Sequence, residues 1–385
     1  MEIEQFRWRQ SNSAWDKGIE PGALGDKAAL VIFFTSRQIL ENRTHLIDNL
    51  KKCYPKAEIV GCSTAGEILG TEVTDDTLIV TAIQFKSTKV KLLTSRVQNA
   101  EHSEMLGKEL MQKLPQEELK HVFVLSDGLK VDGAKLVKGF KQTLKNNSIG
   151  ITGGLAADGE KFEKTRVYCN QLLEEGGIVV VGFYGESFNS SYSAITGWRS
   201  YGPIRTVTKS DGTRLFELDN KPALELYKNF LGDFAKDLPA IGLVYPLRIW
   251  GEGIKKEANL ARTILGVDEK TQSILCAGGI PKGCNVQFMM TNTNELVNAA
   301  SESANNLRVP LKNIHPELCL LMTCVSRKAI MKQRVEEELE AVSEIIGEKT
   351  AYTGFYTYGE ISPYKDGEEC ELQNETMAVT TIWEE

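Results

Sequence analysis

The sequence predicts an α/β protein of the mixed α+β type, with two domains whose mixed or antiparallel sheets are covered by helices. Three observations lead to this prediction. Short apolar runs alternate with segments of helical periodicity, and the order strand, helix, glycine turn, strand occurs three times. The length of 385 residues exceeds that of one ordinary hydrophobic core. We expect hairpin-like strand pairs after each turn, which argues against an open doubly wound sheet.

The three units are predicted from their apolar periodicity. The first has strands at 29–35 and 77–85 around a helix that ends before Pro55. The second has a strand at 121–128, a helix at 133–144 and a strand at 176–185. The third has a strand at 317–323, one long helix over 327–347 and a strand at 377–383.

A glycine turn with the spacing G-x-x-x-x-G-E lies inside each unit. The turns read GCSTAGE (61–67), GLAADGE (154–160) and GFYTYGE (354–360). Because similar elements surround all three, the sequence predicts an internal repeat. A fourth match, GGIPKG at 278–283, lies in a different context and predicts a hairpin between the strands on either side.

The segment 195–227 is rich in turn residues and predicts a domain boundary. The expected division is a lead-in over 1–26, a first domain over 27–205 and a second over 206–385. Beyond the boundary the sequence predicts further strands and one helix. These strands are at 240–249, 262–268 and 285–291, and the helix is at 294–307.

Composition excludes several classes of protein. A net charge of −7 and a pI near 5.5 argue against nucleic-acid and membrane-surface partners, which are polyanionic. There is no apolar stretch of about 20 residues, and the N-terminus is polar, so a cytoplasmic location is expected. The eight cysteines form no C-x-x-C motif, which predicts reduced thiols, no metal site and no resident cofactor.

The glycine turns are not nucleotide-binding loops. Glutamate follows the second glycine where a phosphate loop has lysine, and each turn precedes a strand rather than a helix. The last turn is the strongest candidate binding site. Its Thr357 hydroxyl, the Glu360 carboxylate and the rings of Tyr356 and Tyr358 can line a polar pocket. The alternative is that Thr and Glu only bond the local amides of the turn; the same alternative holds for Thr64 and Glu67 in the first turn.

A second group of candidates is Cys324 and Arg327, in MTCVSRKAIM. Cys324 is expected at the start of a helix, where the helix terminus and an arginine favour thiolate. Arg327 can grip a carboxylate with two parallel contacts. The alternatives are a small apolar residue at a strand end and a surface ion pair. Cys62 lacks a nucleophile elbow and a nearby histidine, so an enzyme is not expected, although thiol catalysis at Cys62 or Cys324 stays open.

Several motifs together resemble the FIST family, a sensory module built from a FIST N and a FIST C domain. They are VGCSTAGEI, GGLAADGEKF, TGWRSYGPIRTVTKSDG, RTILGVD, MTCVSR, and GFYTYGEI followed by QNET. The resemblance covers the chain from about residue 27 to the end and suggests a standalone bacterial-type member. The resemblance implies further candidate ligand-binding residues. Near the last turn these are Asn374 and Thr376. A second tier of candidates in the first domain consists of Ser63, Thr64, Glu67 and Asp158.

The resemblance implies an intracellular signal-input protein that binds a small ligand, with amino acids proposed for the family. Because no kinase, cyclase or receptor segment is recognised in it, the protein is expected to act alone or through a separate partner, and a partner of the histidine kinase, cyclase or chemoreceptor type is the leading expectation. Some relatives are haem proteins that sense nitric oxide, but Gln373 stands where many relatives have histidine, which weakens a haem site here. The leading hypothesis is an amino acid or other small carboxylate, paired by Arg327 and Glu360.

Overall fold

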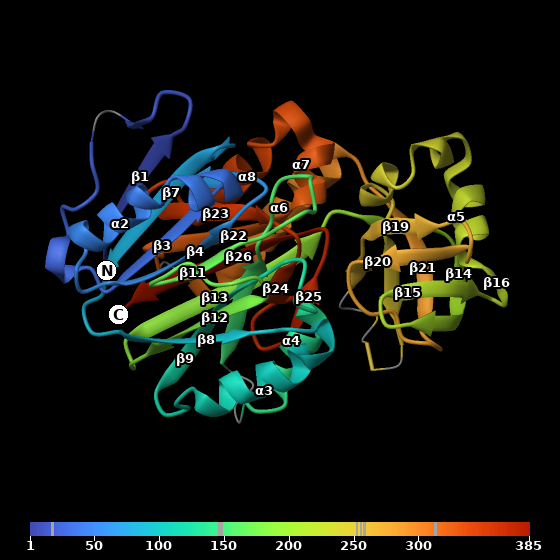
Figure 1. Ribbon diagram of the computed structural model, residues 1–385, viewed down its shortest axis with the longest axis horizontal. Helices are drawn as coiled ribbons and strands as arrows, with labels where there is room; N and C mark the ends of the chain where they lie inside the picture. The colour runs from blue at the N-terminus through green and yellow to red at the C-terminus, as the bar shows by residue number, and fades with distance from the viewer. Residues whose placement is uncertain (17–18, 145–148, 252, 255, 257–258, 312–313) are drawn as a thin grey trace.

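The computed structural model describes residues 1–16, 19–144, 149–251, 253–254, 256, 259–311 and 314–385. Two bodies lie side by side (Figure 1). The main body contains three six-stranded sheets, and the small body, residues 199–290, contains one eight-stranded sheet. The predicted fold class, mixed and antiparallel sheets covered by helices, is confirmed.

Each of the three sheets in the main body belongs mainly to one of the predicted units. The first has the order β11 (Val167–Cys169), β4 (Glu58–Ser63), β3 (Leu30–Thr35), β7 (Thr77–Gln84), β1 (Glu2–Arg9) and β2 (Ala14–Trp15). The second has the order β25 (Cys370–Gln373), β24 (Glu360–Pro363), β10 (Gly150–Leu155), β9 (Leu119–Ser126), β12 (Gly177–Tyr184) and β8 (Lys89–Arg96). The third has the order β13 (Phe188–Thr196), β26 (Thr376–Glu384), β22 (Leu318–Cys324), β23 (Ala351–Thr357), β5 (Glu67–Leu69) and β6 (Glu72–Thr74).

The three sheets share one pairing pattern. A parallel pair, β3 with β4, β9 with β10 or β22 with β23, stands at the centre of each sheet. An antiparallel strand follows on one side: β7, β12 or β26. A further antiparallel strand, β1, β8 or β13, lies beyond it. The same local unit is therefore built three times, whereas its origin by duplication stays a prediction.

The strand after each glycine turn joins the sheet of a neighbouring unit. β5 pairs with β23, β11 pairs with β4, and β24 pairs with β10. The expected hairpins do follow the first and third turns, as β5–β6 and β24–β25. Segments far apart in the sequence are consequently interleaved, and the three turns lie where the sheets meet.

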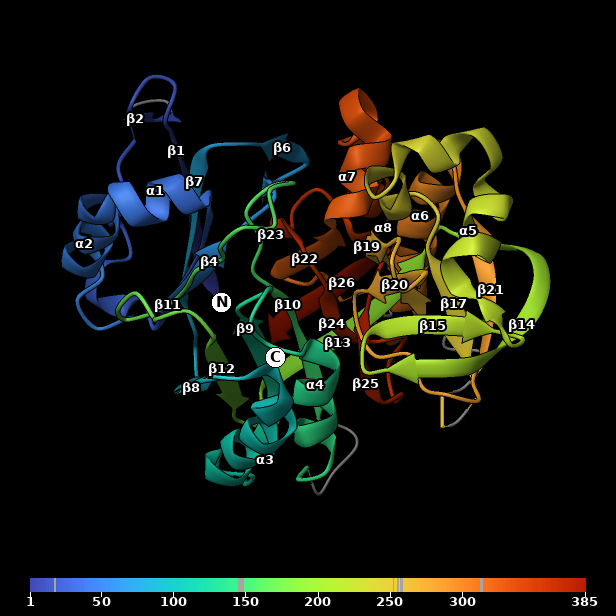
Figure 2. The same ribbon diagram turned by 45° about the vertical axis from the view of Figure 1, so that its right-hand side comes forward.

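The sheets bury a common core between them and are covered by helices on their other faces. Alternate residues of β3, β9 and β22 meet in this central core, since side chains alternate across a strand. The helices are α1 (Arg37–Asn42), α2 (Thr44–Cys53), α3 (Ser103–Lys113), α4 (Gly133–Lys141), α6 (Thr293–Leu311), α7 (Val325–Met331) and α8 (Glu337–Ile346). Figure 2 shows α1 and α2 on the first unit, α3 and α4 on the second, and α6 to α8 on the third.

The long helix predicted over 327–347 is wrong. The chain forms α7, a short 3-10 turn and α8 instead. The break lies at Lys332, whose φ of 51° is left-handed and cannot continue a right-handed helix. This break folds α8 back and brings Glu338 next to Arg327.

The small body is inserted between β13 and α6 and has a hydrophobic core of its own. Its ends lie side by side, because Arg199 pairs with Met290 in adjacent antiparallel strands. Its elements are β14 (Arg199–Asp211), β15 (Arg214–Leu218), β16 (Lys221–Pro222), α5 (Ala223–Leu231), β17 (Leu247–Trp250), β18 (Ala261–Arg262), β19 (Ile264–Asp268), β20 (Ser273–Cys276) and β21 (Asn285–Met290). The predicted domain boundaries, 1–26, 27–205 and 206–385, stay a prediction.

Two local predictions in the small body are wrong. GGIPKG at 278–283 does not close a hairpin, because β20 pairs with β15 and β19 while β21 pairs with β14 and β17. The strand expected over 240–249 is a 3-10 helix at Ala240–Leu243 followed by the short strand β17. Pro246 precedes β17 and lacks the N–H that an extended ladder needs.

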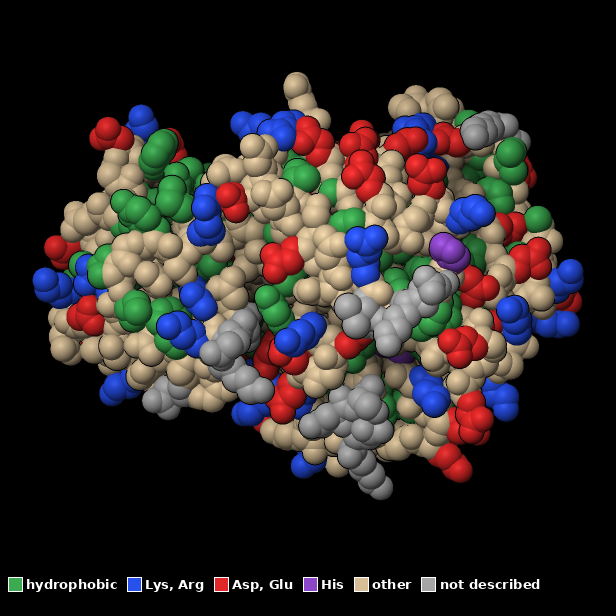
Figure 3. Space-filling view, turned by 180° about the vertical axis from the view of Figure 1, so that it is seen from behind, with side chains coloured by type: hydrophobic (Ala, Val, Ile, Leu, Met, Phe, Trp, Pro, Cys, Tyr) green, Lys and Arg blue, Asp and Glu red, His purple; other side chains and the backbone are tan. Residues whose placement is uncertain are grey.

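The surface carries charges of both signs, as Figure 3 shows for the face opposite to that in Figure 1. Large exposed hydrophobic side chains among the described residues are found mainly on the small body. They include Tyr201, Ile204, Phe234, Leu265 and Met290. No helix in the described part of the chain is long and apolar enough to cross a membrane.

Candidate functional site

The three glycine turns hydrogen-bond to one another in a cycle. The amide of Ala65 donates to the carbonyl of Tyr356 at 2.8 Å, and the amide of Ala157 donates to the carbonyl of Ser63 at 2.8 Å. The amide of Tyr358 donates to the carbonyl of Leu155 at 3.3 Å. Each turn is therefore held by its neighbour.

This cycle corrects the alignment of the second turn by one residue. Gly61, Gly153 and Gly354 occupy the equivalent position, because a Cβ there would lie 2.5, 1.9 and 1.9 Å from the carbonyl oxygen of the neighbouring parallel strand. Glycine is required at this close approach of two backbones. The sequence match began at Gly154 instead, so Glu160 is not the counterpart of Glu67 and Glu360, and it is exposed.

Glu67 and Glu360 perform the same structural task in the first and third units. Oε2 of Glu67 accepts from the amide and hydroxyl of Thr77, at 3.0 and 2.8 Å. Oε2 of Glu360 accepts from the amide and hydroxyl of Thr376, at 3.1 and 2.7 Å. Both glutamates are buried and fix the start of the following long strand. The alternative that these residues only bond local groups therefore accounts for Oε2 of both carboxylates.

The two glutamates differ in their second oxygen. Thr64 donates its hydroxyl to Oε1 of Glu67. Thr357 instead donates to the carbonyl of Gly359 at 2.7 Å. As a result Oε1 of Glu360 is buried with no hydrogen-bond partner among the described residues. A buried acceptor without a donor is costly and calls for an explanation, such as a bound molecule that supplies the donor.

Arg327 lies in a buried network rather than on the surface. Its Nε and Nη2 each lie 2.8 Å from Oε2 of Glu338, and Nη2 also donates to the carbonyl of Leu296 at 2.8 Å. Tyr356 donates to the other oxygen of Glu338 at 2.6 Å. The carboxylate that Arg327 grips is thus internal, and in the described part of the chain its Nη1 has no partner.

Asn374 and Glu375 form the turn that precedes Thr376. Glu375 is fully buried with a left-handed φ of 65°, an arrangement unusual for a residue with a Cβ. Its Oε1 accepts from the hydroxyls of Thr263, at 2.5 Å, and Ser326, at 3.3 Å. Within the described ranges, Oε2 of Glu375 and Oδ1 of Asn374 are both buried without a partner.

The buried carboxyls influence one another electrostatically. Burial raises the pKa of Glu375 to about 8, and Arg327 opposes the shift. Burial also raises the pKa of Glu360 well above its usual range, and the charge of Glu375 adds to the shift. These mutual effects place Glu360, Glu375 and Arg327 in one cluster. We call this group, with Asn374, the acidic cluster.

The expectation of an activated thiolate at Cys324 is wrong. Cys324 does stand at the first position before α7, but burial raises the pKa of its thiol, and the carboxyls of Glu360 and Glu375 raise it further. Burial likewise raises the pKa of Cys62 well above its usual value. Because the thiolate is the nucleophile, these positions do not favour thiol catalysis.

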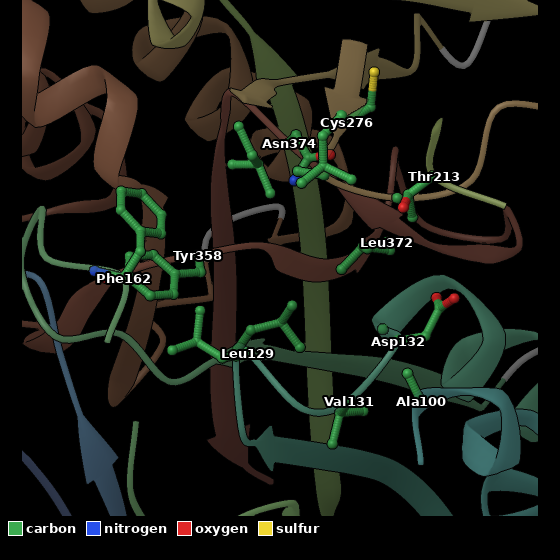
Figure 4. Close-up of a pocket in the computed structure, with 17 residues that line it drawn as sticks. Ala100, Leu129, Val131, Asp132, Phe162, Thr213, Cys276, Tyr358, Leu372 and Asn374 are labelled. Atoms are coloured by element: carbon green, nitrogen blue, oxygen red, sulfur yellow. The ribbon is translucent and has the colours of Figure 1, made fainter. Parts of the chain in front are cut away.

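A cavity of about 250 Å³ lies between the second unit, the third glycine turn and the small body (Figure 4). Asn374 and Tyr358 of the predicted site line it, and Tyr358 stacks on Phe162 with ring centroids 4.4 Å apart. Its wall is mainly apolar. The apolar lining includes Leu129, Val131, Leu155, Phe162, Leu265, Leu275 and Leu372. Asn374 is the residue that this cavity shares with the acidic cluster.

The second-tier residues lie around the first and second turns. Asp158 accepts from the hydroxyl of Tyr358 and from the amides that follow its own turn. Ser63 accepts from the amide of Arg166 at 2.9 Å. A separate cavity of about 180 Å³ is lined by Thr64, Glu67 and Asp158 among others. Two of the predicted residues therefore line the first cavity and three line the second. The others line neither of them: Ser63, Cys324, Arg327, Tyr356, Thr357, Glu360 and Thr376.

Sequence reasoning missed Glu375, Thr263 and Arg262. Arg262 is buried beside the cavity, where it donates to the carbonyl of Gly279 in its own body and to that of Leu372 in the main body. Glu375 lies in the QNET motif, between two residues that were selected. An acidic residue between the selected Asn and Thr is a signal that was present but not used.

Histidines and metal clusters do not mark this site. His121 is buried between Thr152 and Ser190, and burial lowers its pKa to about 3. Gln373 donates to the carbonyl of Ser362 at 3.4 Å. The described residues contain no group of three or more His, Cys, Asp or Glu side chains arranged to hold a metal ion.

Comparisons with known proteins agree with the arrangement of the chain. The FIST N domain matches residues 29–221, and the FIST C domain matches residues 223–363. A protein of Methanocaldococcus jannaschii, described only as uncharacterized, is 25% identical over 222 residues, which are 54% of this chain. The matched part is 42% of that protein, so the chain spans less than half of its length. FIST domains are associated with sensory signal transduction and small-ligand binding rather than with catalysis, and with two domain matches over most of its length the chain belongs to the FIST family.

Proposed function

We propose that this protein is a cytoplasmic sensor that binds an amino acid or another small carboxylate and signals through a separate output protein. One observation carries the proposal. Four polar atoms of the acidic cluster, Glu360 Oε1, Glu375 Oε2, Asn374 Oδ1 and Arg327 Nη1, are buried without partners among the described residues. Native proteins satisfy nearly all such atoms, so a ligand that supplies both donors and an acceptor suits this place.

The roles follow from the contacts of each residue. Nη1 of Arg327 would donate to the ligand carboxylate, and Oε1 of Glu360 would accept from its ammonium group. Tyr356 and Thr376 act as positioning residues, since they hold Glu338 and Glu360. Thr357 fixes the turn, Cys324 fills space beside the carboxyls, and Tyr358 forms part of the cavity wall.

The small body provides a route from ligand to signal. Thr263 of the small body donates to Glu375, and Arg262 donates to the carbonyl of Leu372. A ligand that binds Glu375 either competes with Thr263 for this carboxyl or strengthens the contact between them. In both cases the packing of the two bodies changes. A partner of the histidine kinase, cyclase or chemoreceptor type would read that shift, provided that the ligand prefers one packing over the other.

The test is ligand-induced thermal stabilisation with a panel of the common amino acids and small carboxylates. We expect at least one to raise the melting temperature with saturation, as linkage between binding and folding requires. Asn374→Ala should weaken the effect about tenfold in concentration, whereas Asp75→Ala, at the corresponding exposed position of the first unit, should not. No stabilisation by any member of the panel would contradict the proposal.

Haem binding with nitric oxide sensing is the second candidate function. The observation in its favour is His45, which lines a separate cavity of about 430 Å³ together with Trp8 and Trp15. A Soret band that appears on addition of haem and disappears in His45→Ala would support it. Unchanged haem spectra in the wild-type protein would remove it.

A further inference from the structure

We propose that the group recognised by the acidic cluster is a primary ammonium carrying an apolar tail, held by Glu360, Glu375 and Asn374. This inference rests on the proposed function and narrows its ligand class. It makes the ammonium essential and the carboxylate dispensable.

The first argument is a count of acceptors against donors. The unpartnered acceptor atoms are Glu360 Oε1, Glu375 Oε2 and Asn374 Oδ1, and the unpartnered donor atom of the cluster is Arg327 Nη1, all within the described residues. A primary ammonium has three N–H donors and no acceptor. It can therefore offer a donor to each of these acceptors when both carboxyls are ionised, whereas a carboxylate ligand has no hydrogen to donate and would be repelled by the ionised carboxyls.

The second argument is that the acceptors are held in place by their partnered oxygens. Glu360 is fixed through its other oxygen by Thr376, and Glu375 by Thr263 and Ser326. Each carboxyl keeps one oxygen occupied and one free. A site whose ligand atoms are preorganised in this way loses little conformational entropy on binding.

The third argument comes from the first unit, which serves as an internal comparison. There both oxygens of Glu67 are occupied, by Thr64 and Thr77. The residue corresponding to Glu375 is Asp76, which also has a left-handed φ and precedes the threonine, but Asp76 is exposed. The third unit thus departs from the first at the atoms needed to bind a cation, and the small body covers it there.

The fourth argument concerns the remainder of the ligand. The cavity next to Asn374 is mainly apolar, and its described lining includes no Lys, Arg or His. Its volume of about 250 Å³ is below the about 300–1,000 Å³ of pockets for drug-sized ligands, so a small tail fits it. A carboxylate placed in this cavity would find no cation among the described lining residues, while an aliphatic tail would be buried favourably.

Binding of a cation at this cluster is coupled to loss of a proton. Burial keeps the pKa of Glu375 at about 8, so near neutral pH this carboxyl holds a proton in the free protein. The charged and titratable groups that face Glu360 and Glu375 are Arg327, Cys324 and Tyr227. An ammonium favours the ionised carboxyl, and affinity should therefore rise as the pH increases from 6 to 8.

The experiment compares three molecules with the same tail by titration calorimetry and thermal shift. They are 3-methylbutylamine, leucine and 4-methylpentanoate. We expect the amine and leucine to bind and the acid not to bind. Binding of leucine and the acid without the amine would overturn this inference and leave the proposed function standing. If none of the three binds but another amino acid or carboxylate does, the proposal of an ammonium with an apolar tail is wrong. If nothing in the wider panel binds, this proposal and the proposed function both fail.

Variants separate the cluster from a merely structural role. Glu375→Gln should weaken binding of 3-methylbutylamine at least tenfold and reduce the rise in affinity with pH, part of which Glu360 should retain, while Asp76→Asn should change neither. Asn374→Ala supplies a second test if Glu375→Gln does not fold. Unchanged affinity in a folded Glu375→Gln or Asn374→Ala protein would contradict the assignment.

Discussion

At the scale of single residues, Arg327 does pair with a carboxylate, as its chemistry predicts, but that carboxylate belongs to the protein itself rather than to a ligand. It was selected because arginine pairs with carboxylates, and in the structure it pairs with Glu338, both side chains being fully buried. A buried ion pair adds little compared with apolar residues of the same shape, but removal of one partner leaves an uncompensated charge.

Arg327→Met should therefore destabilise the protein by about 3–5 kcal/mol. Denaturation in urea measures the change. Arg334→Met, which removes an exposed partner of Glu337, should leave the midpoint unchanged. The double variant Arg327→Met with Glu338→Leu should recover part of the loss, and a mild effect of Arg327→Met alone would show that the pair is more hydrated than the structure indicates.

Glu67 predicts a pH dependence of stability. Burial raises its pKa from 4.5 to about 7, so between these values the folded state binds more protons than the unfolded state. The stabilisation is complete below pH 4.5 and is lost as the pH rises to about 7, with a slope of at most about 1.4 kcal/mol per pH unit from this group.

Glu67→Gln should flatten this decline, since the amide stays neutral, whereas Glu160→Gln at the exposed second turn should not. Urea midpoints at pH 5, 6, 7 and 8 provide the measurement. Part of the slope should persist in Glu67→Gln because Glu375 and Glu360 also have raised pKa values. An equal slope in wild type and Glu67→Gln would contradict the assignment.

At the scale of elements, the sequence predicted the strands well and their partners poorly. Apolar runs such as 29–35 and 121–128 are strands within one or two residues of their predicted ends. The sheet that each strand joins depends on contacts between distant segments, and no periodicity encodes these. The same limit explains the helix break at Lys332, which follows from tertiary packing rather than from helix propensity.

The three equivalent glycines give a prediction for these elements. Gly153→Ala and Gly354→Ala place a Cβ 1.9 Å from the carbonyl oxygen of Val124 or Leu321, and backbone atoms cannot move aside cheaply. Each should cost at least about 1–3 kcal/mol. Gly266→Ala is the matched control, since its Cβ would lie 3.9 Å from the nearest atom, Leu275 Cβ.

Melting temperatures of the three variants decide the matter. Near-wild-type stability of Gly153→Ala would mean that Gly154, as in the sequence alignment, is the true counterpart of Gly61 and Gly354. The outcome therefore tests the one-residue correction as well as the packing.

At the scale of the whole molecule, the candidate site could be predicted only in part. Glu360, Asn374 and Arg327 were selected and do lie in one cluster. The third turn and the motif after it carry Glu360 and Asn374, and α7, which follows the neighbouring strand β22, carries Arg327. Glu375 was missed although it lies between two selected residues, whereas Thr263 was missed for a physical reason. The site is completed by the small body folding back on the third unit, across more than 100 residues of sequence.

The interleaving of strands also makes a prediction about the two matched domains. β13 from the first match pairs with β26 beyond the second, and β24 from the second match completes the sheet of β10. Residues 1–222 expressed alone should therefore be insoluble or lack near-ultraviolet circular dichroism. Co-expression with residues 223–385 should give soluble protein with a near-ultraviolet signal. A stable, cooperatively folded 1–222 fragment would contradict this.

The small body, in contrast, should be removable. Its ends, Arg199 and Met290, are paired neighbours, and its core is separate from those of the main body. Insertions whose ends lie close together at the surface are commonly tolerated, and so is their deletion. Replacement of residues 200–289 by a short glycine-serine linker should leave a main body that unfolds cooperatively. This body should be less stable than the full protein, because Trp198 loses its cover from Met289.

In the shortened variant Glu375 loses its hydrogen bond from Thr263, so its carboxyl should be accessible to water and titrate with a lower pKa. The ammonium ligand should then bind weakly or not at all. If the shortened chain binds as tightly as the full protein, the small body is not part of the site; if it does not fold, the small body is integral to the core rather than a cover over the third unit.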